Sequence, residues 1–212
     1  MATYKKGILG VFTGKVGTVV GSSWKGIDYI KSLPKSGSRT PSQLQLDQRL
    51  KFGLVTSFLK PIKQLTSIGY GTVKGSISPS NAAASYHLNE AVIGTSPDFE
   101  IDYPKVIFSR GELPGPASPS AVAGSGAEID FAWADNSAAN LAQTTDKAVL
   151  LVYGETSKQF VFEDTATRAS VGATMQLPPN FTGETVHVWM AFFSANDKQA
   201  STSVYLGTVV VS

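Results

Sequence analysis

The clearest pattern of apolar and polar positions lies in residues 40–65, TPSQLQLDQRLKFGLVTSFLKPIKQL. Apolar side chains recur there at every fourth position, and Val55, Leu59 and Leu65 widen the apolar face. A recurrence every three to four residues is typical of an amphipathic helix with one buried face. The pattern therefore predicts a helix whose buried stripe consists of Leu46, Leu50, Leu54, Phe58 and Ile62.

Signals at both ends set the limits of this helix. Thr40 is a suitable N-cap, Pro41 suits the first helical position, and Gln43 stands where a capping box places its Glu or Gln. Pro61 removes a helical hydrogen bond, so we expect the helix to kink or end at about residue 60. A shorter, alanine-rich helix is expected from Ser80 through NAAASYHLNEAVI to a glycine cap at residue 94.

The segments around the helices indicate strands. Residues 3–33 combine β-branched and aromatic side chains with a glycine every few positions, and residues 34–40, PKSGSRT, indicate a basic loop. FEIDYPKVIFSRG, residues 99–111, alternates apolar and polar positions on either side of a proline, which fits an edge strand. Residues 112–128, ELPGPASPSAVAGSGAE, are typical of a linker or long loop.

Six strand-like runs follow at near-regular spacing: EIDFAW, AVLLVYG, KQFVFED, ATMQL, TVHVWMAFFSA and SVYLGTVVV. Short strands separated by polar turns indicate an antiparallel β-sandwich. We therefore expect a mainly β protein with one or two helices. Residues 1–98 would form an α+β part, and residues 99–212 a C-terminal antiparallel sandwich.

The distribution of charge also divides the chain, near residue 75. Residues 1–75 hold twelve basic and two acidic residues, a balance of +10, whereas the rest of the 212-residue chain has a balance of −8. Charged residues make up only 16% of the chain, below the roughly 25% usual for soluble domains. Oppositely charged parts can pair within a molecule or between copies, and a basic part can also meet nucleic acid.

The glycine-rich stretch GVFTGKVGTVVG, residues 10–21, invites comparison with phosphate-binding loops. A loop of the G-x-x-x-x-G-K-[ST] kind would need a glycine at position 9 and a hydroxyl at position 16, where this chain has Leu9 and Val16. The spacing of Gly14, Gly17 and Gly21 also departs from the dinucleotide pattern G-x-G-x-x-G. We therefore interpret these glycines as positions where strands bend or another backbone comes close.

Other catalytic patterns are missing from the sequence. The chain has no cysteine, and its two histidines, His87 and His187, lie on a predicted helix and a predicted strand as ordinary satisfied or exposed side chains. Glu163 and Asp164 would point to opposite faces of a strand, and Asp98, Glu100 and Asp102 alternate as a solvated edge would. We expect no catalytic residues, no cofactor and no metal site.

Longer motifs resemble known proteins. Trp133 in the first of the six strands, the KAVLLVY strand and the closing valine strand are similar to an immunoglobulin or fibronectin type III sandwich. The whole chain also resembles a bacterial family of uncharacterised proteins, through an opening GxxGxFxGKVGxVVGxxWKGxxYxxSLP, a QLxQRxKF helix start, an NAAxSYxL segment and an IDYxKVxxSRGxLPG junction. Because that family has no established activity, the resemblance implies no catalytic residue.

We hypothesise a non-enzymatic, self-assembling structural protein, such as a subunit of a filament, shell or phage-like particle. Its basic N-terminal part would make the contacts, through Gly10, Gly14, Lys15, Gly17, Gly21, Trp24 and Lys25. Two alternatives stay open: nucleic-acid binding by the same basic part, and a surface binding or adhesion module based on the sandwich. The lack of a signal-peptide core and of a long apolar segment predicts cytoplasmic synthesis without a membrane span, and a place in a particle or extracellular assembly fits the same features.

Overall fold

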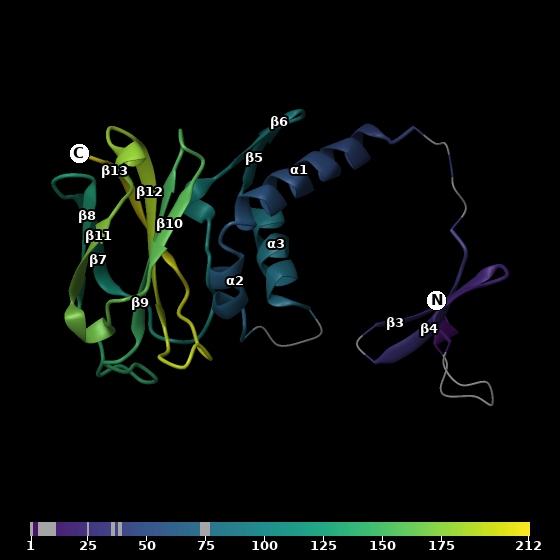
Figure 1. Ribbon diagram of the computed structural model, residues 1–212, viewed down its shortest axis with the longest axis horizontal. Coiled ribbons are helices and arrows are strands. Elements are labelled where there is room, and N and C mark those ends of the chain that lie inside the picture. The colour runs from purple at the N-terminus through teal and green to yellow at the C-terminus, as the bar shows by residue number, and fades with distance from the viewer. Residues whose placement is uncertain (1, 4–11, 25, 35–36, 38–39, 73–76) are drawn as a thin grey trace. The chain divides into compact units, whose positions relative to one another are not determined.

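The computed structural model describes residues 2–3, 12–24, 26–34, 37, 40–72 and 77–212 (Figure 1). It divides into two compact units, Met1–Ser42 and Gln43–Ser212. The boundary that the sequence suggested, between residues 98 and 99, falls inside the second unit. The helices before this boundary share one hydrophobic core with the strands after it.

The described strands of the first unit form one antiparallel sheet in the order β1-β4-β3-β2. The strands are β1 (Ala2–Thr3), β2 (Gly14–Val16), β3 (Val19–Trp24) and β4 (Ile27–Ser32). A two-residue turn joins β2 to β3, and its first residue, Gly17, has a φ of 60°. Tight hairpin turns need such a left-handed conformation, which glycine adopts without steric cost.

Both predicted helices are present in the second unit, as α1 (Gln43–Leu59) and α3 (Pro79–Glu90), and a further short helix, α2 (Lys63–Gly69), lies between them. α1 ends just before Pro61, as expected. Ser78 caps α3 by accepting a hydrogen bond from the backbone N–H of Asn81 at 3.3 Å. The expected glycine cap at residue 94 is wrong, because the chain leaves the helix at Glu90 and forms a hairpin of β5 (Val92–Thr95) and β6 (Asp98–Ile101).

The apolar stripe predicted for α1 is buried only at its C-terminal end. Phe58 and Ile62 are 8% and 1% exposed, whereas Leu46 and Leu50 are 39% and 46% exposed. Four residues turn a helix by about 400°, so a strict four-residue repeat moves about 40° around the axis at each step. The stripe therefore begins on the solvent side of α1 and reaches the core only in the last turns.

The sandwich consists of two antiparallel sheets (Figure 1). One has the order β10-β9-β12-β13, with β10 (Phe160–Glu163), β9 (Lys147–Gly154), β12 (Thr185–Phe193) and β13 (Val204–Val210). The other has the order β11-β8-β7, with β11 (Gly172–Gln176), β8 (Glu128–Ala134) and β7 (Ala117–Ala123). The six strands expected after residue 128 are confirmed.

Strands β9 and β12 are buried on both faces, which explains their almost unbroken apolar sequences. One face packs against the alternating side chains Ile129, Phe131 and Trp133 of β8 in the core between the sheets. The other face, which includes Leu151 and Trp189, packs against the helices. The second unit thus has three layers, with the helices covering one side of the sandwich (Figure 1).

The interpretation of residues 112–128 as a linker is wrong for the part that forms β7. Pro119 lies in this strand, where the pairing with β8 shifts register between Ala117 and Ser120. β7 is the last strand of its sheet in the described part of the chain, and an edge strand with a bulge tolerates proline. Its small alanine and serine side chains hid it from a search for β-branched patterns.

Candidate functional site

The structure gathers most of the predicted assembly contact in one hairpin of the first unit. Gly14 and Lys15 lie on β2, opposite Gly21 and Val20 of β3, and Gly17 lies in the turn between them. Trp24 ends β3. Gly10 and Lys25, the other two predicted residues, lie outside the described residues.

Gly21 shows the close approach that we expected of these glycines. A Cβ atom placed there would lie 2.7 Å from ring carbons of Phe12 and would also meet the Phe12 carbonyl group. Side chains do not come that close in real structures, so the position requires glycine. At Gly14 a Cβ would meet nothing within 4 Å, and what favours glycine is the φ of 107°.

The register of the hairpin places the basic and aromatic residues on one face of the sheet. Val20 lies opposite Lys15 on one side and Lys31 on the other, and Ser22 lies opposite Tyr29. Directly paired residues point to the same face, and so do positions two apart on a strand. We call this face, which carries Lys15, Val20, Ser22, Trp24, Ile27, Tyr29 and Lys31, the basic face.

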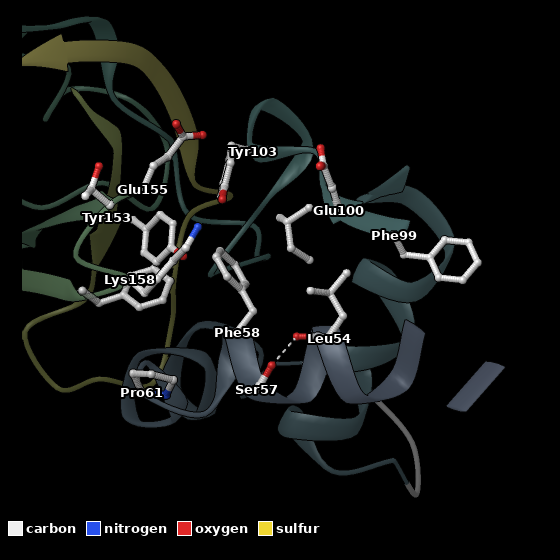
Figure 2. A pocket seen from close by; sticks show the side chains of 13 residues that line it. Leu54, Ser57, Phe58, Pro61, Phe99, Glu100, Tyr103, Tyr153, Glu155 and Lys158 are labelled. Carbon is white, nitrogen blue, oxygen red and sulfur yellow. Dashed lines mark hydrogen bonds between the residues drawn. The ribbon is translucent and has the colours of Figure 1, made fainter. Parts of the chain in front are cut away.

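A pocket of about 730 Å³ lies in the second unit, between the helices and the sandwich (Figure 2). Helix α1 supplies Leu54, Ser57 and Phe58. The side of the pocket opposite α1 comes from residues 99–103 and from residues 153–160, which run from the end of β9 to the start of β10. Segments about 100 residues apart in the sequence therefore meet at this site.

Four aromatic rings form the floor of the pocket, those of Phe58, Tyr103, Tyr153 and Phe160. The Phe58 ring centroid lies 5.3 Å from that of Tyr153 and 5.1 Å from that of Phe160, both in edge-to-face geometry. The rings of Tyr103 and Tyr153 are 5.5 Å apart. Each ring supports its neighbours at favourable aromatic distances, so the floor is preformed.

Two carboxylates flank Tyr103 at the rim. Figure 2 shows Glu100 on one side of the Tyr103 ring and Glu155 on the other, with Lys158 on the Glu155 side. The Glu155 carboxylate lies 3.1 Å from Nε2 of His187. Glu100 makes no ion pair with any residue in the described part of the chain.

His187 lies behind the pocket and is fully engaged, as the sequence interpretation expected. Its Nδ1 is 2.8 Å from the Tyr205 hydroxyl, and its ring stacks on Tyr103 with centroids 4.0 Å apart. The stack therefore holds the Tyr103 ring in place, and His187 is not among the described residues that line the pocket.

Burial dominates the electrostatics of the tyrosines. Removal from water raises the pKa of Tyr103, and the neighbouring Tyr153, Glu155 and Glu100 raise it further. Burial likewise raises the pKa of Tyr153. Both hydroxyl groups therefore stay protonated at neutral pH.

A fully buried ion pair of the second unit lies outside the pocket. Arg168 Nε is 3.1 Å from Asp146 Oδ2, and both side chains are buried. Arg168 also donates to the Pro114 carbonyl group and covers the Phe192 ring at 3.8 Å. These contacts leave the guanidinium no open side, which fits a structural role. Among the described residues, no three His, Asp or Glu side chains group as metal ligands would.

Sequence reasoning missed the pocket because its residues form no local motif. Glu100 was interpreted only as part of an acidic edge, and Phe58 only as a core residue. Phe160 and Tyr153 come from two strands that the sequence did not pair. The one available signal was the concentration of aromatic and acidic residues in the turns next to apolar strands.

Residues 11–207 match a family described as a family of unknown function, DUF6266. The chain belongs to this family. The match confirms the resemblance to an uncharacterised family that the motifs indicated. No curated protein matches the chain significantly.

Two of the similar solved structures are human fibronectin type III domains. The domain of collagen alpha-1(XX) is 11% identical, with a TM-score of 0.34 over 47% of this chain and 86% of that domain. The domain of contactin 1 is 12% identical, with a TM-score of 0.32 over 57% of this chain and 88% of that domain. The assignment of the sandwich rests on the strand order and the core described above.

No helix in the described ranges is both long enough and apolar enough to cross a bilayer.

Proposed function

We propose that this protein is a non-enzymatic structural subunit that assembles with copies of itself through its N-terminal unit, in a filament, shell or phage-like particle. The observation that carries the proposal is the exposure of the N-terminal sheet. Within residues 12–24 and 26–34 only Gly21 is buried, while Val16 and Ile27 are 59% and 53% exposed. Val16 and Ile27 lie on opposite faces of the sheet, so both faces are exposed. Small sheets gain independent stability only when a face is covered, and self-association would provide that cover.

The edge of the same sheet offers a second means of contact. β2 is the last strand in the order β1-β4-β3-β2 among the described strands. An edge strand presents backbone N–H and C=O groups to which another chain can add a strand. Lys15 lies at the middle of β2, and a lysine on an edge strand discourages unspecific pairing with other chains. A specific partner strand would therefore have to compensate the charge of the Lys15 ammonium group.

Charge supports contacts between unlike surfaces of neighbouring copies. Residues 1–42 hold seven basic residues and one acidic residue, a balance of +6, and residues 43–212 have a balance of −4. A contact between a basic unit and an acidic unit is head-to-tail, and repeated head-to-tail contacts produce rings or filaments. The low share of charged residues agrees with a surface that is partly covered.

Size-exclusion chromatography with light scattering, at low and high salt, tests the proposal. We expect masses that are multiples of 22.4 kDa and that fall as salt rises. Lys15→Gln with Lys31→Gln should reduce the assembled fraction, whereas Lys198→Gln, a change at an exposed lysine of the second unit, should not. A mass of 22.4 kDa that salt and concentration leave unchanged would contradict self-assembly.

A second candidate function, nucleic-acid binding, is favoured by the basic face. Lys15 and Lys31 lie there beside Tyr29 and Trp24, and lysines with aromatic rings can contact phosphates and stack on bases. This function predicts a mobility shift with single-stranded DNA or RNA that weakens steeply with salt. Absence of a shift at low salt would eliminate it.

The pocket supports a third candidate function, that of a surface binding module. An aromatic floor with carboxylates at its rim has the general chemistry of a ligand site. A glycan array tests this function directly, since aromatic rings and carboxylates also bind sugars. Binding that Glu100→Gln abolishes would favour this candidate over self-assembly.

A further inference from the structure

The pocket and the basic face have complementary chemistry. The pocket mouth carries two carboxylates around an aromatic floor, and the basic face carries exposed lysines. We propose that the pocket receives, between the Glu100 and Glu155 carboxylates of its mouth, the side chain of Lys15 from the N-terminal hairpin of a second copy. This inference rests on the proposed function, because it names the contact that would join neighbouring subunits.

The aromatic floor suits the whole length of a lysine side chain. Lysine buries its methylene groups along apolar surfaces and keeps its ammonium group at the polar end. Here the rings of Phe58, Tyr153 and Phe160 would cover the methylene groups. An ammonium group near Tyr103 would gain from the ring electrons as well as from both carboxylates.

The rim has an uncompensated acidic residue. The Glu155 carboxylate contacts the His187 imidazole, whereas Glu100 has no ion pair with a described residue. Lys15 likewise has no ion pair within the described ranges, and it is exposed on the edge strand β2. Joining the two would satisfy a charge on each side of the contact.

The ring geometry favours a cation over a sugar. Sugars stack on broad, open ring faces, but Phe58 and Tyr153 are only 8% and 6% exposed, and they meet edge to face. Tyr103 already uses one face for His187. The available surface is therefore narrow and acidic at its mouth, which matches a linear cationic side chain.

Lys158 is the one basic residue among the described residues that line the pocket. It lowers the net negative charge of the rim and would repel an incoming ammonium group. Lys158→Gln should therefore strengthen the contact with Lys15. If the same change weakened the contact, the pocket would be a site for an anion and the inference would be wrong.

Carbodiimide crosslinking of the full, unsubstituted chain tests the contact, because this reagent joins a lysine amine to a carboxylate by an amide bond only where the two groups touch. Unlabelled and ¹⁵N-labelled protein are mixed, and mass spectrometry identifies crosslinked peptides that combine the two isotopes and therefore come from two copies. The matched control is the link from Lys15 to Asp130, an exposed carboxylate on β8 of the other sheet. We expect about tenfold more mixed-isotope Lys15–Glu100 peptide than Lys15–Asp130 peptide, since a specific contact raises the effective concentration.

Each other outcome has a defined meaning. If scattering shows oligomers but Lys15 links to Glu100 no more often than to Asp130, the pocket contact is wrong and self-assembly stands. If the Lys15–Glu100 peptides never combine the two isotopes, the occupant is the chain's own N-terminal unit, which overturns the contact between copies. A monomer that forms no mixed-isotope peptide contradicts both proposals.

Discussion

The ring of Tyr103 stacks on the imidazole of His187, with centroids 4.0 Å apart and planes 24° from parallel. This contact joins the 3-10 turn Tyr103–Lys105, which follows the β5-β6 hairpin, to the middle of the large sheet. The same tyrosine forms part of the pocket floor. The stack therefore connects the stability of the helical layer to the shape of the pocket.

Replacing Tyr103 should separate these two roles. Tyr103→Ala removes the stack together with a partly buried ring, and we expect a loss of about 2–3 kcal/mol in the free energy of unfolding. Tyr103→Phe keeps the ring and should cost about 1 kcal/mol or less, the value of a typical hydrogen bond. Urea denaturation followed by tryptophan fluorescence measures both. Equal losses for the two variants would show that the hydroxyl, not the stack, carries the effect.

The fold was largely predictable because its strongest signals are local. Apolar runs such as AVLLVYG and TVHVWMAFF marked the strands β9 and β12, and Pro61 marked the end of α1. What failed depended on long-range packing: β7 is held by β8 despite its small side chains, and the apolar stripe of α1 reaches the core only in its last turns. Local sequence patterns do not show which face of a strand or helix a neighbouring element will cover.

The site was less predictable than the fold, for the same reason. The hairpin of Gly14, Lys15 and Gly21 is contiguous in sequence, and the glycine and β-branched pattern indicated strands there, although it did not show the turn at Gly17 or the pairing of the two strands. The pocket joins Phe58, Glu100 and Glu155 only through the tertiary fold. The spacing of these residues along the chain does not show that they lie close together in the fold.

The buried pair of Arg168 and Asp146 gives a prediction about stability. Arg168→Leu leaves the Asp146 carboxylate buried without its charge partner, and such changes cost about 3–5 kcal/mol. Lys147→Ala, which breaks a pair with Asp197 whose side chains are 31% and 40% exposed, should cost about 1 kcal/mol or less. Thermal and urea unfolding check both variants. A similar small loss for both would mean that water reaches Asp146.

Two glycine substitutions should act in opposite directions. Gly21→Ala forces a Cβ against Phe12, and overpacking of this kind costs about 1–3 kcal/mol. Hydrogen exchange of the β2 and β3 amides should then become faster, and the assembled fraction should fall. Gly53→Ala lies in α1 where a Cβ meets nothing within 4 Å, so it should stabilise the protein by up to about 1 kcal/mol. Unchanged exchange in Gly21→Ala would contradict the close approach.

His87 makes stability depend on pH in a defined window. The imidazole is fully buried, and its Nδ1 donates to the Ala83 carbonyl group at 2.8 Å within α3, while Nε2 has no partner among the described residues. Burial lowers the pKa of His87 below its usual 6.5. Below about pH 6.5 His87 therefore binds a proton in the unfolded chain but not in the folded protein. The free energy of unfolding thus falls as the pH falls toward the lowered pKa of His87.

Comparison with a His87→Leu variant isolates this contribution, since leucine fills a similar buried volume without titrating. Urea unfolding between pH 7.5 and 5 should show a decline in the wild-type free energy of unfolding with a slope of up to about 1.4 kcal/mol per pH unit. The variant should decline less over the same range, because only carboxylates then contribute. Parallel curves for the two proteins would mean that His87 binds its proton equally well in the folded and unfolded states.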